Sequence, residues 1–180
     1  MTVREWREVR REPLADCKVF SVERSIAASP EDGTEHRFYR IVSADWAQVV
    51  PVTSAGEIVM VREFRHGSMR MSLEVPGGLV EPGEAPAEAA RRECLEETGY
   101  RVREVLPLGV LNPNPALFGN RLHTFCAFDA EPASSIQNTG TEHTELVLVP
   151  RVDLPELLSA GSIDHALIAA TLWRFLHEHG

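Results

Sequence analysis

The chain has 180 residues, of which 43% are hydrophobic and 25% charged, and its formal net charge at pH 7 is −9. This length and composition predict a soluble globular protein with one catalytic domain and a sizeable core. The acidic balance excludes a general nucleic-acid binder, and no segment approaches the ~20 apolar residues that a membrane-spanning helix needs.

The N-terminal region, residues 1–44, shows the alternation of apolar and polar residues that is typical of strands. It contains no obvious catalytic chemistry. We expect Pro13 to break the first strand and a turn near Gly33 to separate the last two. The expected strands are 4–10, 16–26 and 36–43.

Residues 45–180 contain the remaining elements of the predicted fold. Two apolar segments, 46–53 and 57–65, predict consecutive core strands joined at Ala55-Gly56, and they lead to the glycine-rich sequence LEVPGG at 73–78. Beyond the central helix described next, we expect strands at 103–111, 121–128 and 146–150, a polar loop at 131–144, and helices at 153–158 and 163–176.

A helix is predicted from Pro86, where the missing N–H costs nothing, to the residue before Gly99, which accepts a left-handed C-terminal cap. Its apolar face carries Cys94, which we expect to be a small buried hydrophobe. Its other face carries three glutamates within one turn, and like charges at this spacing destabilise a helix. A cation should offset them, and Mg²⁺ prefers carboxylate and carbonyl oxygens. The three acids are Glu93, Glu96 and Glu97.

The three cysteines are widely spaced and form no CxxC pair, so neither a disulfide framework nor a zinc site is predicted. We therefore expect reduced thiols. The N-terminus also lacks the apolar segment of a signal peptide. Together these features predict a cytoplasmic protein.

The spacing of the residues around this helix resembles a family motif. Gly78 is followed after five residues by Glu84, after seven more by Arg92-Glu93, and then by Glu96-Glu97 and Gly99. This is the Nudix box, G-x5-E-x7-R-E-U-x-E-E-x-G-U, at every fixed position. The chain thus resembles the Nudix hydrolases, which implies an α/β/α sandwich with a mixed sheet.

The resemblance also implies roles for the residues of the box. The carboxylates and one backbone carbonyl hold Mg²⁺, with Mn²⁺ as an alternative, and the acids take part in catalysis. The metal ligands implied are the Gly77 carbonyl, Glu93, Glu96 and Glu97. The structural positions implied are Gly78, Glu84, Arg92 and Gly99.

Further segments resemble the group of ADP-ribose and nucleoside diphosphate sugar pyrophosphatases. Val61-Arg62-Glu63-Phe64-Arg65 is similar to its "VrQyR" segment, in which the last arginine contacts the diphosphate. This implies that Arg65 binds substrate and that Arg62 assists, although a solvated arginine is nearly as good an explanation of Arg62. Trp46 either stacks on a nucleobase or lies in a dimer interface. Pro115, or Pro113, matches a proline associated with ADP-ribose hydrolysis.

In the same group a loop glutamate lies near the attacking water. Glu142 matches it best, with Glu145 as the second choice. An N-terminal sheet of this kind often forms a homodimer and contributes to the partner's substrate pocket. The alternative is that residues 1–44 only cover their own core.

The resemblance implies metal-dependent hydrolysis of ADP-ribose or a related nucleoside diphosphate sugar to a nucleoside monophosphate and a sugar phosphate. Two alternatives share the box. One is a pyrophosphohydrolase of nucleoside triphosphates such as dNTPs, and the other is a non-catalytic sensor that binds ADP-ribose. Neither nucleic acid nor a membrane is expected as a partner, and the base and the sugar are not determined by the sequence.

Overall fold

The computed structural model describes residues 2–138, 140–141 and 143–180. The chain divides into two compact units, one formed by Met1–Ala44 with Asn112–Arg121 and the other by Asp45–Leu111 with Leu122–Gly180. The turn-rich segment 112–121 groups with the N-terminal strands rather than with the residues that flank it.

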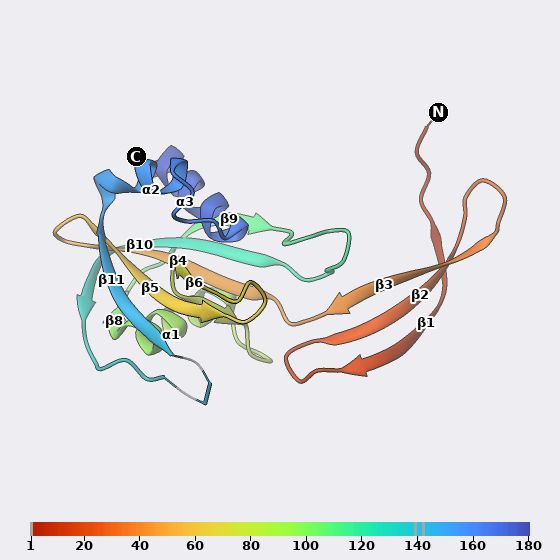
Figure 1. The fold of residues 1–180 in the computed structure, drawn as a ribbon, viewed down its shortest axis with the longest axis horizontal. Helices are drawn as coiled ribbons and strands as arrows, with labels where there is room; N and C mark the ends of the chain where they lie inside the picture. Colours follow the sequence, from red (N-terminus) through yellow and green to blue (C-terminus); the bar gives the residue numbers. More distant parts are fainter. Residues whose placement is uncertain (1, 139, 142) are drawn as a thin grey trace. The chain divides into compact units, whose positions relative to one another are not determined.

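The first unit contains a three-stranded antiparallel sheet of β1 (Arg7–Asp16), β2 (Ser21–Ala28) and β3 (Glu35–Val42), in the order β1-β2-β3 (Figure 1). The expectation that Pro13 ends the first strand is wrong, because β1 continues through it to Asp16. Proline is tolerated there since β1 is an edge strand, and the register shifts between Pro13 and Ala15. Ion pairs join the strands, as between Arg40 and Glu23 at 2.9 Å.

The second unit is built on a mixed sheet, in which β10 runs parallel to β4 and the other pairings are antiparallel. Among the described residues the strand order is β11-β5-β4-β10-β8, with β6 paired to β5, β7 to β4 and β9 to β10. The strands are β4 (Trp46–Thr53), β5 (Glu57–Arg65), β6 (Arg70–Glu74), β7 (Gly77–Leu79), β8 (Tyr100–Arg101), β9 (Leu106–Leu111), β10 (Leu122–Pro132) and β11 (Thr144–Pro150).

Several strands differ from the prediction, among them β2, which begins at Ser21 rather than at residue 16. The strand expected at 103–111 begins only at Leu106, after the short β8, and β10 continues to Pro132 beyond the expected 121–128. The short strands β6 and β7 were not predicted, because the sequence between Arg70 and Leu79 has no long apolar alternation.

The helices of the second unit are α1 (Pro86–Thr98), α2 (Leu154–Ser159) and α3 (Ala166–His179), and the 3-10 helix η1 (Arg151–Asp153) precedes α2. The predicted limits of α1 are confirmed. Pro86 is its first residue, and Gly99 caps it in the left-handed region at φ 73° while its N–H donates to the Leu95 carbonyl. No helix in the described part of the chain combines the length and the apolar character needed to cross a membrane.

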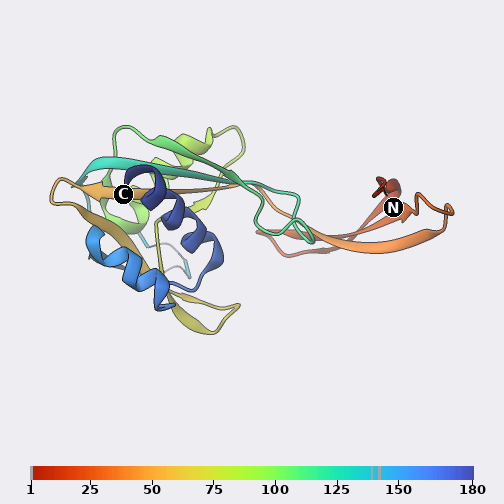
Figure 2. The same cartoon turned by 90° about the horizontal axis from the view of Figure 1, so that it is seen from above.

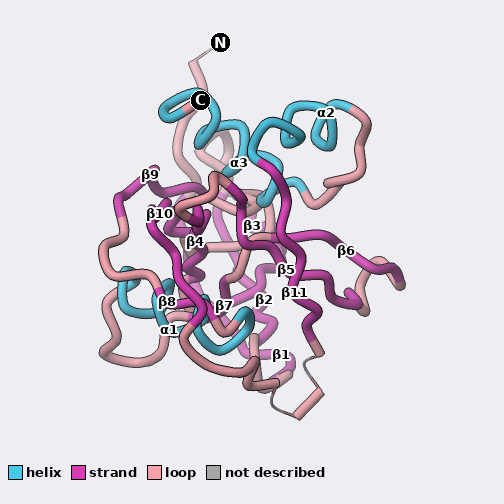
Figure 3. Tube along the Cα trace, turned by 90° about the vertical axis from the view of Figure 1, so that its left-hand side faces the viewer, coloured by secondary structure: helices cyan, strands magenta, loops and turns pink. Residues whose placement is uncertain are grey.

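The sheet of the second unit lies between two layers of helix. Figures 1 and 3 show α1 on one side of β4, β5 and β10 and the α2–α3 pair on the other. In Figure 2, α3 lies over β4, in agreement with the hydrogen bond between Gln48 and Thr171. Alternate residues of β5 face the two layers, since Val59 packs with α1 whereas Ile58 and Met60 pack with α2 and α3.

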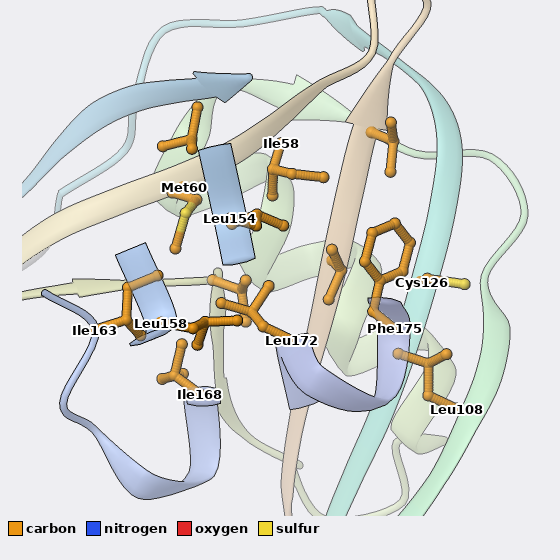
Figure 4. Close-up of a cluster of buried hydrophobic side chains, with 14 residues drawn as sticks. Ile58, Met60, Leu108, Cys126, Leu154, Leu158, Ile163, Ile168, Leu172 and Phe175 are labelled. Atoms are coloured by element: carbon orange, nitrogen blue, oxygen red, sulfur yellow. The ribbon is translucent and has the colours of Figure 1, made fainter. Parts of the chain in front are cut away.

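Each side of the sheet has its own apolar core. Figure 4 shows the larger one, in which Leu154 of α2 and Leu172 and Phe175 of α3 share a cluster with Ile58, Met60 and Cys126 of the sheet. The smaller core lies under α1 and includes Cys94, which is fully buried as predicted. The expected fold class, an α/β/α sandwich with a mixed sheet and a separate N-terminal antiparallel sheet, is confirmed.

Candidate active site

The α1 side of the sheet changes from apolar to charged along β5. Because side chains alternate along a strand, Glu63 and Arg65 share the face of Val59, which packs against α1. Thr144 of β11 lies opposite Glu63 in the sheet, and its hydroxyl donates to the backbone carbonyl of Glu97 at 2.9 Å. The end of β5 and the end of α1 are thereby held close together.

Two glycines allow the loop before α1 to lie against both the sheet and the helix. A Cβ at Gly77 would overlap the Ala47 carbonyl and Gln48 of β4. A Cβ at Gly78 would overlap the Glu93 carboxylate. The N–H of Gly77 donates to Glu97 Oε2 at 3.0 Å. Close packing against the backbone of β4 thus requires glycine at Gly77, whereas a Cβ at Gly78 would require the Glu93 carboxylate to move, and neither position needs an unusual φ.

Glu97 is an ionisable group held in a desolvated place. Burial raises the pKa of its carboxyl to about 8, the Gly77 hydrogen bond opposes the shift, and the negative charge of Glu93 adds to it. The carboxylate form therefore lacks sufficient positive charge around it. A divalent cation that takes oxygen ligands would supply that charge, so the residues present fit Mg²⁺.

Glu93 and Glu96 both contact Arg92, whose Nη1 lies 2.8 Å from Glu93 Oε1 and 3.3 Å from Glu96 Oε2. Among the described residues, no three His, Cys, Asp or Glu side chains are already grouped as a metal cage. Each carboxylate has two oxygens with several acceptor sites, so Glu93 and Glu96 can contact Arg92 and still coordinate an ion.

Arg92 also connects α1 to the loop before it. Its Nε and Nη2 donate to the two oxygens of Glu84 at 2.9 and 3.0 Å, and Nη2 donates to the Leu79 carbonyl at 3.0 Å. These bonds hold the pKa of Glu84 below its ordinary value. Gly99, at the other end of α1, accepts backbone hydrogen bonds from Ala133 and Ser134 that follow β10.

Arg65 lies between two carboxylates on the α1 face. Its Nε and Nη2 donate to Glu74 Oε1 and Oε2 at 2.8 and 2.7 Å, and Nη2 lies 2.7 Å from Glu63 Oε1. Burial alone would raise the pKa of Glu74, but the hydrogen bonds from Arg65 hold it below the ordinary value. The same pairing raises the pKa of Arg65.

Other residues implied by the resemblance are placed elsewhere. Arg62 pairs with Glu145 at 3.1 Å, and both lie on the α2–α3 face, because they alternate with Val61 and Leu146. Trp46 begins β4 and alternates with Ala47, so it also faces away from α1. The structure does not bring these three side chains together with the acids of α1.

Two further residues belong to other parts of the chain. Pro115 is exposed in the turn-rich segment of the first unit. Glu142, the first choice for the loop glutamate, lies outside the described residues.

The sequence reasoning missed the part played by Glu74 and Glu63. Glu74 stands between two apolar residues in the sequence LEV and is only 2% exposed. A glutamate inside an apolar strand is rarely buried without a partner, so this pattern could have indicated a buried ion pair. Its partner Arg65 lies across the β5–β6 hairpin, which was not predicted.

The fold and the site define a class of protein: an α/β/α sandwich in which one helix directs carboxylates toward a glycine loop, an arrangement suited to divalent cations and phosphates. The model of the NUDIX domain matches residues 44–171, and the chain therefore belongs to the Nudix family. The predicted family is confirmed.

Comparison with known proteins identifies relatives that match different shares of the chain. A Bacillus subtilis protein named ADP-ribose pyrophosphatase is 37% identical over 79 residues, which span 44% of this chain and 43% of that protein. The Escherichia coli K12 ADP compounds hydrolase NudE is 26% identical over 164 residues, spanning 90% of this chain and 87% of NudE. The mouse ADP-sugar pyrophosphatase is 31% identical over 144 residues, spanning 74% and 66% of the two chains.

A crystal structure described as an ADP compounds hydrolase has the same fold. It superposes with a TM-score of 0.86 at 23% sequence identity and covers 99% of this chain and 96% of that chain. The shared fold includes the N-terminal sheet as well as the sandwich.

Proposed function

We propose that this protein hydrolyses the pyrophosphate bond of ADP-ribose or a related ADP-sugar, giving AMP and a sugar phosphate, with Mg²⁺ as the cofactor and Mn²⁺ as a substitute. The observation that carries the proposal is the partly buried Glu97 carboxyl, which accepts a hydrogen bond from the Gly77 N–H within a complete Nudix box. The names of the relatives in three organisms support ADP compounds as substrates.

In this proposal the acids of α1 bind the cation. Glu93, Glu96 and Glu97, with the Gly77 carbonyl, would hold Mg²⁺, which neutralises a diphosphate and lowers the pKa of an attacking water. The Arg65 guanidinium would bind a phosphate oxygen of the substrate, for which its planar donor set is suited. Glu142 remains the proposed acceptor of the water's proton.

The test is a hydrolysis screen in Mg²⁺ over ADP-ribose, UDP-glucose, GDP-mannose, NADH and dNTPs, with the products separated. We expect AMP and ribose 5-phosphate from ADP-ribose. Monophosphate and pyrophosphate from dNTPs, with ADP-ribose untouched, would favour the triphosphate alternative. Tight binding of ADP-ribose without turnover would instead indicate a sensor.

A matched pair of variants completes the test. Glu97→Gln removes the charge of the proposed metal ligand, and we expect activity to fall by about 100-fold or more. Glu156→Gln removes the same charge at an exposed site on α2 and is expected to leave activity unchanged. Glu97→Gln activity within about threefold of wild type would contradict the metal-site assignment.

We also propose that the protein is a cytoplasmic homodimer that associates through the N-terminal sheet. This sheet leaves large apolar side chains accessible in its own unit, including Trp6, Phe38 and Tyr39. Exposed apolar side chains do not stabilise a monomer, whereas packing against a second copy would remove these side chains from water. The free thiols of Cys17, Cys94 and Cys126 agree with a reducing compartment.

A further inference from the structure

Arg65 makes two unlike ion pairs on the α1 face of the sheet. Glu74 accepts from both Nε and Nη2 and is 2% exposed. Glu63 Oε1 lies 2.7 Å from Nη2, and the side chain of Glu63 is 15% exposed, whereas the side chain of Arg65 is 44% exposed. Glu74 is thus an enclosed partner with two hydrogen bonds from Arg65, and Glu63 is the more exposed partner of the two.

The planar geometry of the Arg65 guanidinium determines which of its N–H groups remain available to bind a phosphate. Because Glu74 takes the Nε–Nη2 edge, the Nη1–Nη2 edge is directed away from it. That second edge is the one that can grip two phosphate oxygens at once. Glu63 Oε1 lies 2.7 Å from Nη2, the nitrogen that this edge shares with the edge held by Glu74.

The two carboxylates are not equally easy to displace. If Arg65 left Glu74, a buried carboxylate would lose both hydrogen bonds from its charged partner, which is strongly unfavourable in a desolvated place. If Arg65 left Glu63, the more exposed carboxylate of the two would lose its ion pair, and the contribution of an ion pair to stability falls as its exposure to solvent rises. A phosphate therefore competes with Glu63 and not with Glu74.

Accordingly, we propose that Glu74 is the positioning residue for Arg65, and that Glu63 occupies the phosphate-binding edge of Arg65 until the substrate's diphosphate displaces it. The inference rests on the proposed function, in which Arg65 binds the diphosphate. It assigns opposite effects to the two glutamates: Glu74 assists substrate binding, whereas Glu63 opposes it.

Steady-state kinetics of the full chain with ADP-ribose and Mg²⁺ tests this assignment. For Glu74→Gln we expect KM to rise about tenfold, since charge-assisted hydrogen bonds orient Arg65, with kcat changed by less than about threefold. For Glu63→Gln we expect KM to fall about threefold, because a partly exposed ion pair no longer competes with phosphate. A rise in KM for Glu63→Gln equal to that for Glu74→Gln would overturn the proposal.

A double-mutant cycle shows whether Glu74 acts through Arg65. Arg65→Lys cannot form the two-point contact, so adding Glu74→Gln to it should raise KM no further. Additive effects on KM would mean that Glu74 acts independently of Arg65, against the proposal. If Glu74→Gln does not fold, Glu74→Asp replaces it, since it keeps the charge but withdraws the carboxylate, and an unchanged KM would then count against the proposal.

Binding of ADP with Mg²⁺, measured by calorimetry in the same variants, separates this inference from the proposed function. If wild type hydrolyses nothing in the screen, the proposed function fails. The opposite changes in ADP affinity for Glu74→Gln and Glu63→Gln would still support the roles given to the two glutamates, and equal changes would still contradict them.

Discussion

Arg92 on α1 holds Glu84 of the preceding loop by two nearly parallel hydrogen bonds, Nε to Oε1 at 2.9 Å and Nη2 to Oε2 at 3.0 Å. The same side chain donates to the Leu79 carbonyl at 3.0 Å. Neither Arg92 nor Glu84 is largely exposed. Arg92 therefore connects α1 to the loop that follows Gly77 and Gly78.

Arg92→Ala should loosen this loop. We expect the free energy of unfolding to fall by about 2 kcal/mol, because hydrogen bonds between charged groups are lost at a partly buried position. Urea unfolding followed by circular dichroism measures it. The control is Arg103→Ala, which breaks an exposed pair with Glu131 and should change stability by less than about 0.5 kcal/mol. Equal losses in the two variants would show that the Arg92–Glu84 contact has no special importance.

Gly78→Ala should impair activity without unfolding the protein. The added Cβ would overlap the Glu93 carboxylate, and that side chain must turn aside. We expect kcat/KM for ADP-ribose to fall about 100-fold, since displacement of a catalytic constellation by about 1 Å has effects of this size. Gly67→Ala is the control, because a Cβ there has open space and the backbone φ is ordinary. Full activity of Gly78→Ala would exclude a catalytic part for Glu93 in its present position.

Local and long-range features of the fold differed in how well the sequence predicted them. The limits of α1 depend on Pro86 and Gly99, whose conformational preferences are properties of the residues themselves, so they were predicted correctly. The extent of β1 depends on its place at the edge of a sheet, which tolerates Pro13, and edge position is decided by strand pairing.

The candidate site shows the same contrast between features that depend on local sequence and features that depend on strand pairing. The acids of α1 share one turn of a helix, so their proximity follows from spacing alone. The pairing of Arg65 with Glu74 depends on the register between β5 and β6. Arg65 and Arg62 lie on opposite faces because they are three residues apart on one strand. The resemblance implied that Arg65 binds phosphate, but only the fold shows that Glu74 and Glu63 are its ion-pair partners.

The raised pKa of Glu97 predicts a pH-dependent stability in the absence of metal. Burial raises this pKa from 4.5 to about 8 in the folded chain. The stabilising contribution of the neutral carboxyl is fully present below about pH 4.5 and is lost as the pH rises through about 8, since the folded state then binds more protons than the unfolded one. The loss over this range is on the order of a few kcal/mol.

Glu97→Gln removes this dependence. In EDTA we expect the variant to be less sensitive than wild type to a rise from pH 5 to pH 8.5, and therefore relatively more stable at the higher pH. Added Mg²⁺ should stabilise wild type at pH 8.5 more than the variant, because the variant lacks one of the proposed carboxylate ligands. Urea unfolding at both pH values measures the effect, and parallel pH profiles for the two proteins would contradict it.

The N-terminal sheet carries an aromatic cluster of Trp6, His36 and Phe38, in which Trp6 meets the other two rings edge-on with centroids 5.4 and 5.3 Å apart. Phe38 is nevertheless 45% exposed. If this sheet forms the proposed homodimer, Phe38→Glu places a charge in an apolar interface and should yield monomers. Light scattering would then fall from twice the 20.0 kDa of one chain to a single chain mass.

Val152→Glu provides the matched control, because Val152 is 84% exposed on η1 in the other unit and a charge there should leave the mass unchanged. A monomeric wild type would remove the homodimer from the proposal. A dimeric Phe38→Glu variant would instead move the interface away from the aromatic cluster, since an unpaired charge buried at an interface is strongly unfavourable.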